Sequence, residues 1–156
     1  MSRGQRIAQA IERSVSGPMW HGPALADLLE DVNADAAASY PIKGAHSIWE
    51  LVLHITAWTE IARERLAGSA KADPTPEEDW PPVRDKSAEA WRGARERLKD
   101  AHRELAEEVG SLDDAVLISR LPGKDHTALV MYHGIIEHDA YHGGQIAVLK
   151  KALTSD

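Results

Sequence analysis

The stretch HDAYHGGQI, residues 138–146, combines side chains that can bind a metal ion or move a proton. His138 and His142 are four residues apart, so on a helix both imidazoles project from one face, about one turn from each other. This spacing lets both rings reach a single ion at about 2.0–2.1 Å. The neighbouring positions spaced by three and four are mostly apolar, as in the buried seam of a helix. The pattern therefore places polar side chains at positions that are expected to be buried.

A third histidine, His54, lies in the upstream segment ELVLHITAW. We expect it towards one edge of the apolar arc of that helix. From spacing alone, two interpretations of the three histidines stay open. Each buried imidazole costs about 1–3 kcal/mol unless its nitrogens find hydrogen-bond partners. Separate hydrogen bonds would meet this need one ring at a time, whereas a shared metal ion would satisfy three nitrogens together.

Three further polar residues are candidates for assisting such a site. Asp139 makes the segment similar to the HExxH of zinc proteases, but Asp is a methylene shorter than Glu, so we expect a solvated carboxylate or one that contacts a ligand. Glu50 lies one turn before His54 and is either an acceptor for that imidazole or a helix-capping residue. Gln145 is expected to line the pocket or to bridge to a neighbouring helix.

The other conspicuous residues are expected to have structural roles. Gly143 and Gly144 each cost about 1 kcal/mol relative to Ala inside a helix, which indicates close helix packing or room for a substrate. His133 and Glu137 are interpreted as surface or dimer contacts, and Trp80 as an anchor for its loop rather than a cover for the site. No role is assigned to four other histidines, which are His21, His46, His102 and His126.

Composition narrows the class of protein. The formal net charge is −7 and no run of Lys and Arg could follow a phosphate backbone, so we expect no nucleic-acid partner. The absence of Cys excludes thiolate chemistry, disulfides and Cys-ligated metal sites. Apolar residues make up 43% of the chain, yet no apolar run has the length of a membrane span or a signal peptide. A cytoplasmic protein without a membrane partner is therefore expected.

Helical periodicity runs through the chain, and no segment alternates as a strand would. We predict four long helices, with a shorter one after Pro23, and Ser47 with Glu50 has the spacing of a capping box. A segment with four prolines, approximately residues 68–85, is long enough for a crossover. The pattern predicts an all-α four-helix bundle that forms a single domain over residues 1–156. Its long helices are expected at approximately residues 3–16, 46–67, 86–109 and 126–153.

Three segments together carry a resemblance to a known family. SIWELVLHITAW, WHGPALADLL and the C-terminal HxxxH followed by GQI are similar to the DinB/YfiT family of metal-binding four-helix proteins. The resemblance covers most of the chain. It implies a bundle with a three-His metal site at one end, commonly dimeric. Carried over by position, it implies His54, His138 and His142 as the ligands.

Three neutral imidazoles would leave at least one coordination position of a divalent ion open, which is typical of catalytic zinc sites. We expect Zn or Ni first, while Fe or Cu would also suit imidazole. The resemblance implies metal-dependent hydrolysis of a small molecule, or transfer with a low-molecular-weight thiol. Both depend on a metal that lowers the pKa of its bound nucleophile. The alternative is a non-catalytic, stress-associated, dimeric metal-binding bundle.

Overall fold

The computed structural model describes residues 1–68 and 73–154. This part of the chain contains eight helices and no β-strand, so the predicted all-α class is confirmed. None of these helices combines the length and the apolar character that a membrane span requires. The four long helices are α1 (Arg3–Ser16), α4 (Ile48–Leu66), α6 (Ala88–Gly110) and α8 (Ala128–Leu153). The four short ones are α2 (Leu25–Leu29), α3 (Ala34–Ala38), α5 (Pro76–Asp79) and α7 (Asp114–Ile118).

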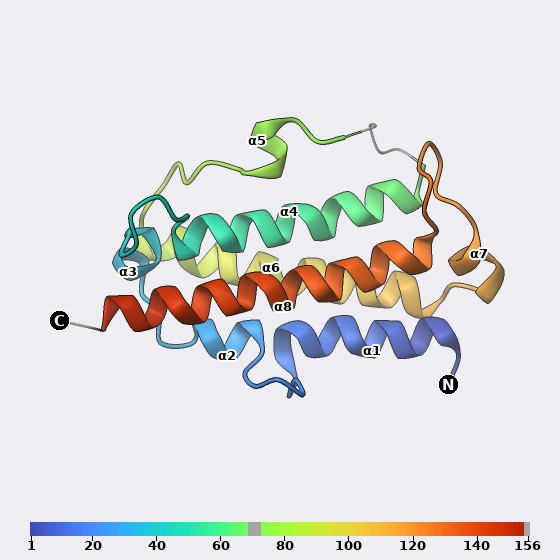
Figure 1. Ribbon diagram of the computed structural model, residues 1–156, viewed down its shortest axis with the longest axis horizontal. Coiled ribbons are helices and arrows are strands. Elements are labelled where there is room, and N and C mark those ends of the chain that lie inside the picture. The colour runs from blue at the N-terminus through green and yellow to red at the C-terminus, as the bar shows by residue number, and fades with distance from the viewer. Residues whose placement is uncertain (69–72, 155–156) are drawn as a thin grey trace.

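The four long helices lie alongside one another (Figure 1). Both α1 and α4 pack against α6 and α8, so the four helices enclose the core between them. One part of the core gathers around Trp49, Ile55 and Trp91. The other part gathers around Ile11 and Tyr132. The apolar periodicity of the sequence therefore becomes a common interior.

Side-chain caps begin the two helices that carry the candidate histidines. At the start of α4 the Glu50 N–H donates to Ser47 Oγ at 3.2 Å, and the Ser47 N–H donates to the Glu50 carboxylate at 2.8 Å. The predicted capping box is thus confirmed. At the start of α8 the Val130 N–H donates to Thr127 Oγ1. All four long helices begin and end within two residues of the predicted positions.

The sequence-based count of helices was incomplete. The short helix after Pro23 was expected and is α2, but α3, α5 and α7 were not. Each of these has four or five residues, which is too few for apolar periodicity to show. The predicted crossover at residues 68–85 lies in part outside the described residues. Within the described part, α5 and the segment after it lie along α4 (Figure 1).

Candidate metal centre

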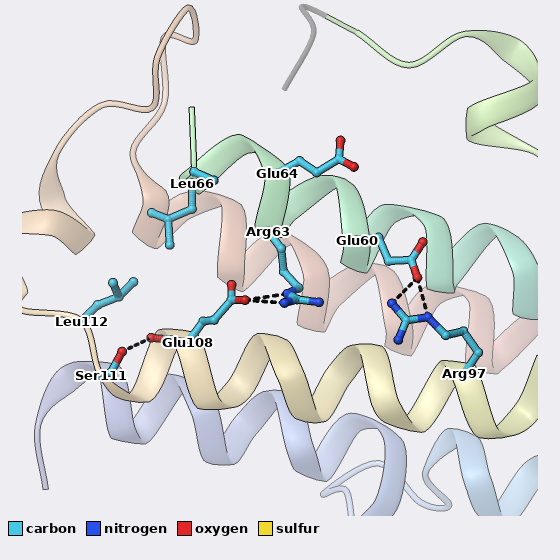
Figure 2. A pocket seen from close by; sticks show the side chains of 9 residues that line it. Glu60, Arg63, Glu64, Leu66, Arg97, Glu108, Ser111 and Leu112 are labelled. Atoms are coloured by element: carbon cyan, nitrogen blue, oxygen red, sulfur yellow. Dashed lines mark hydrogen bonds and ion pairs between the residues drawn. The ribbon is translucent and has the colours of Figure 1, made fainter. Parts of the chain in front are cut away.

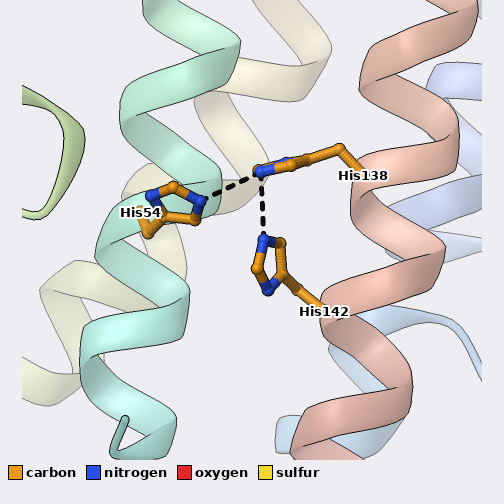
Figure 3. Close-up of side chains that lie close together, drawn as sticks. All are labelled: His54, His138 and His142. Atoms are coloured by element: carbon orange, nitrogen blue, oxygen red, sulfur yellow. Dashed lines mark hydrogen bonds between the residues drawn. The ribbon is translucent and has the colours of Figure 1, made fainter. Parts of the chain in front are cut away.

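Three imidazoles from two helices meet in the described structure (Figure 3). His54 comes from α4, and His138 and His142 come from α8. The Nε2 atom of His138 lies 3.0 Å from Nε2 of His54 and 3.1 Å from Nε2 of His142. The structure therefore brings together the three histidines that the sequence singled out.

The position of this cluster differs from the prediction. Each of the three histidines lies in the middle third of its helix, and α4 packs against α8 along this stretch. The cluster therefore lies in the seam between α4 and α8, and not at the end of the bundle. His54 and His142 are buried, and His138 is half-buried.

Hydrogen bonds fix the tautomers of two of the imidazoles. Nδ1 of His54 lies 2.7 Å from the backbone carbonyl oxygen of Asp79, so Nδ1 carries the proton that is donated. Nδ1 of His142 lies 2.6 Å from Oε1 of Gln145 and donates in the same way. A neutral imidazole has one N–H, so both rings direct an Nε2 lone pair towards His138.

His138 cannot satisfy both lone pairs. Its Nε2 can donate at most one proton, so one of its two close nitrogen contacts has no hydrogen between the atoms. Its Nδ1 is buried without a hydrogen-bond partner among the described residues. Hydrogen bonds alone therefore leave the cluster unsatisfied, and a cation between the Nε2 atoms would complete it.

The environment keeps all three rings neutral. Burial lowers the pKa of His54 and of His142 below the ordinary value. Burial, followed by the neighbouring His142 and His54 rings, lowers the pKa of His138 to about 4. Metal ions bind the neutral imidazole. The three side chains are therefore in the protonation state that a ligand needs at neutral pH.

The segment after α5 closes one side of the cluster. The indole of Trp80 stacks on His54, with 3.8 Å between ring centroids, and on His46, with 3.6 Å. The Asp79 carboxylate accepts a hydrogen bond from the Trp58 indole N–H at 2.7 Å. Trp80 was expected only to anchor its loop, but it also covers one face of a cluster imidazole. His46, to which no role was assigned, supports that indole from an exposed position.

A pocket of about 480 Å³ opens beside the three histidines. Its wall is mainly apolar and includes Trp58, Met131 and Ile135. Among its lining residues, Asp79 is the carboxylate and Arg65 is the cation outside the cluster. An ion held by the histidines would thus border a space of the size that small molecules occupy.

A larger pocket, of about 790 Å³, lies on another part of the surface (Figure 2). Its two arginines are already paired with glutamates of neighbouring helices. Arg63 donates to Glu108 at 2.8 Å, and Arg97 donates to Glu60 at 2.7 Å. These ion pairs join α4 to α6, so we interpret this pocket as a structural contact between helices.

Asp139 is neither solvated nor hydrogen-bonded to a histidine of the cluster, contrary to both expectations for it. It is buried, and its Oδ2 accepts a hydrogen bond from Ser14 Oγ at 2.6 Å. The same carboxylate lies 3.2 Å from Nε2 of His102. His102 was assigned no role, yet it is buried on α6 and pairs with Asp139. The pairing of His102 with Asp139 was not predicted, because the position of His102 on α6 does not show which residue of α8 it will meet.

Glu50 and Gln145, the other two candidates for assisting the histidines, make different contacts. Glu50 closes the capping box and accepts a hydrogen bond from the Tyr40 hydroxyl at 2.9 Å. The acceptor for Nδ1 of His54 is instead the carbonyl of Asp79, from a segment 25 residues away in the chain. Gln145 contacts His142 directly on the same helix. Neither contact was predicted, because Gln145 was expected to line the pocket or to bridge to a neighbouring helix; it does not line the pocket beside the histidines, and its hydrogen-bond partner lies on its own helix.

The two glycines beside His142 are not required by close packing. A Cβ on Gly143 would lie 3.5 Å from Leu25, which is an ordinary contact distance, and a Cβ on Gly144 would meet nothing within 4 Å. Neither glycine lines the pocket beside the histidines. Both expected explanations, close helix packing and room for a substrate, are therefore unsupported by the structure.

One comparison with known proteins found a match. Residues 20–146 match the DinB superfamily, and the match includes all three histidines of the cluster. Searches of the curated proteins and of the solved structures found no match.

Proposed function

This chain belongs to the DinB superfamily, and we propose that it is an enzyme that holds one divalent transition-metal ion through His54, His138 and His142. The observation that carries the proposal is the convergence of three Nε2 atoms that hydrogen bonds cannot all satisfy. Zn and Ni suit three imidazoles, and Fe and Cu also accept them. A bound ion would lower the pKa of a nucleophile that occupies its open position.

The protein's own residues would orient the ligands and exclude water. The Asp79 carbonyl and Gln145 Oε1 accept the outer N–H groups of His54 and His142 and so hold both rings with Nε2 inward. Trp80 covers one face of His54. The apolar pocket wall would keep bulk water from a bound substrate.

The carboxylate of the pocket favours a thiol over water as the nucleophile. A hydrolase commonly uses a general base beside the metal. The candidate is Asp79, but its Oδ1 already accepts a hydrogen bond from Trp58 and lies 3.3 Å from Nδ1 of His54. A thiol that coordinates a metal loses its proton without such a base. We therefore propose transfer with a low-molecular-weight thiol and a small-molecule substrate, and hydrolysis is the second candidate.

Metal content per chain tests the proposal. Protein stripped with a chelator and reloaded with Zn(II) or Ni(II) should retain about one ion per chain on elemental analysis, as one three-His site holds one ion. Replacement of His54, His138 or His142 by Ala should abolish this retention. His133→Ala is the matched control, because His133 is exposed on the same helix as two of the ligands.

Two results would overturn the assignment. Wild-type protein that retains no ion would return the histidines to hydrogen bonding, and full retention in the Ala variants would place the ion elsewhere. If the ion is retained, assays of thiol transfer and of hydrolysis decide between the two activities. Turnover of neither class across a broad set of substrates would favour a non-catalytic metal-binding protein.

A further inference from the structure

Arg65 lies at the far side of the pocket that borders the three histidines. It follows His54 by eleven residues, or about three helical turns, so it shares one face of α4 with His54 and Trp58. Its side chain is only 11% exposed. A buried guanidinium is costly unless an anion or several acceptors surround it. Its partners therefore show whether the structure itself neutralises this charge.

The described residues offer the Arg65 guanidinium few acceptors for its N–H groups and little negative charge. Its Nε is buried without a hydrogen-bond partner among them. The nearest carboxylate oxygen in an ion pair is Oδ1 of Asp73, 3.9 Å from Nη2 and on a side chain that is 82% exposed. That same oxygen accepts a shorter hydrogen bond, 3.0 Å, from Lys124. Arg65 thus shares a distant and solvated counter-ion, which leaves it able to receive an anion.

The path from Arg65 to the histidines is short and mainly apolar. The guanidinium carbon lies 5.2 Å from the centroid of the Trp58 ring. The Trp58 centroid in turn lies 6.2 Å from that of His138. A small molecule that extends across Trp58 would place one end at the histidines and the other at the guanidinium.

We propose that this pocket selects small molecules that carry a carboxylate, and that Arg65 receives this group while the other end of the molecule reaches the metal. The planar guanidinium presents paired N–H donors that match the two oxygens of a carboxylate. The alkyl or aryl part between the two ends would pack on Trp58, Met131 and Ile135. The inference rests on the proposed metal site and adds the substrate class to it.

Two probes of equal chain length separate the carboxylate from the rest of the ligand. Protein loaded with Co(II) is titrated with 6-mercaptohexanoate and with 6-mercaptohexanol, and the sulfur-to-cobalt absorption band reports binding of each thiol. We expect the carboxylate to bind about tenfold more tightly or better, because hydrogen bonds between charged partners are stronger than neutral ones. In Arg65→Gln this preference should disappear, while the affinity for the alcohol stays unchanged.

A matched control separates Arg65 from the general charge of the protein. Arg92→Gln removes the same charge from an exposed position on α6, where Arg92 pairs with Glu96, and should keep the preference. Equal affinities in wild-type protein, or a preference that persists in Arg65→Gln, would overturn the carboxylate site alone. A protein that takes up no Co(II) would instead overturn the metal centre and this inference with it.

Discussion

His102 and Asp139 form a buried pair in which Nε2 and Oδ2 are 3.2 Å apart and each side chain is 1% exposed. Ser14 donates to the same carboxylate, so α1, α6 and α8 are joined at one point. Asp139 directly follows His138 on α8 and lies three residues before His142. The pair therefore fixes the rotation of the helix that carries two histidines of the cluster.

Replacement of Asp139 tests the strength of this junction. We expect Asp139→Ala to lower the free energy of unfolding by about 3 kcal/mol, because it leaves the buried His102 without its carboxylate partner. Urea unfolding followed by circular dichroism measures the loss. Glu137→Ala, an exposed change on the same helix, should cost less than about 0.5 kcal/mol. Similar losses in both variants would show that the junction contributes little.

Gln145 should control metal affinity through His142. Gln145→Leu removes the acceptor of the Nδ1–H of His142, so that the ring is no longer held with Nε2 inward. We expect metal affinity to fall about 10–100-fold, as is usual when such a partner of a ligand is lost. Competition with a chromogenic chelator measures the change. Gln145→Glu keeps an acceptor and should retain most of the affinity, and a loss equal to that of the Leu variant would contradict this role.

Acid should destabilise the metal-free protein through His138. Burial, with the nearby His142 and His54 rings, lowers its pKa from 6.5 to about 4 in the folded state. The unfolded chain therefore takes up the proton first. The contribution of neutral His138 to the free energy of unfolding is fully present above the pKa of the unfolded chain. It is lost as the pH falls from that pKa towards the pKa of the folded state, by at most about 1.4 kcal/mol per pH unit and by less where solvent reaches the ring.

The measurement is the free energy of unfolding in the presence of a chelator between pH 7 and pH 5, compared between wild-type protein and His138→Gln. The variant should show the smaller loss on acidification. Burial opposes protonation of His102, but the charge of Asp139 and hydrogen bonds raise the pKa of His102. The stability that His102 contributes is therefore fully present below the pKa of the unfolded chain, so His102 does not cause the loss of stability on acidification. Parallel curves for the two proteins would exclude His138 as the cause.

Gly144→Ala should stabilise the protein. The added Cβ would meet no atom within 4 Å, so the gain in helix propensity has no steric cost. We expect about 1 kcal/mol by thermal or urea unfolding, with the metal affinity unchanged. A fall in metal affinity would show instead that the glycine serves the site through motion of α8.

Features within a single helix could be read from the sequence. The spacing of His138 and His142 and the capping box of α4 both depend on positions three or four residues apart. The contact between Gln145 and His142 has the same kind of spacing, although it was not predicted. Helical geometry alone brings such positions together. The apolar periodicity likewise predicted the four long helices to within two residues.

Features that join separate segments could not be read in this way. Asp79 reaches His54 from within the Pro-rich segment, and Trp80 of the same segment stacks on that ring. No residue spacing encodes either contact, because each depends on where the crossover lies against α4. The sequence likewise does not show that Arg65 lies 3.9 Å from its counter-ion whereas Arg63 hydrogen-bonds directly to a glutamate. This difference between the two arginines arises only when the chain folds.

The sequence by itself determined that the chain is helical, that two histidines share one face of α8, and that a third lies on α4. Only the tertiary structure decided that the three Nε2 atoms meet in the seam between these helices, that Asp139 turns inward to His102, and that a nearly buried arginine borders the pocket. The physical reason is that helix periodicity fixes the direction of a side chain within its own helix. The partner that a side chain meets depends on the packing of all the helices together.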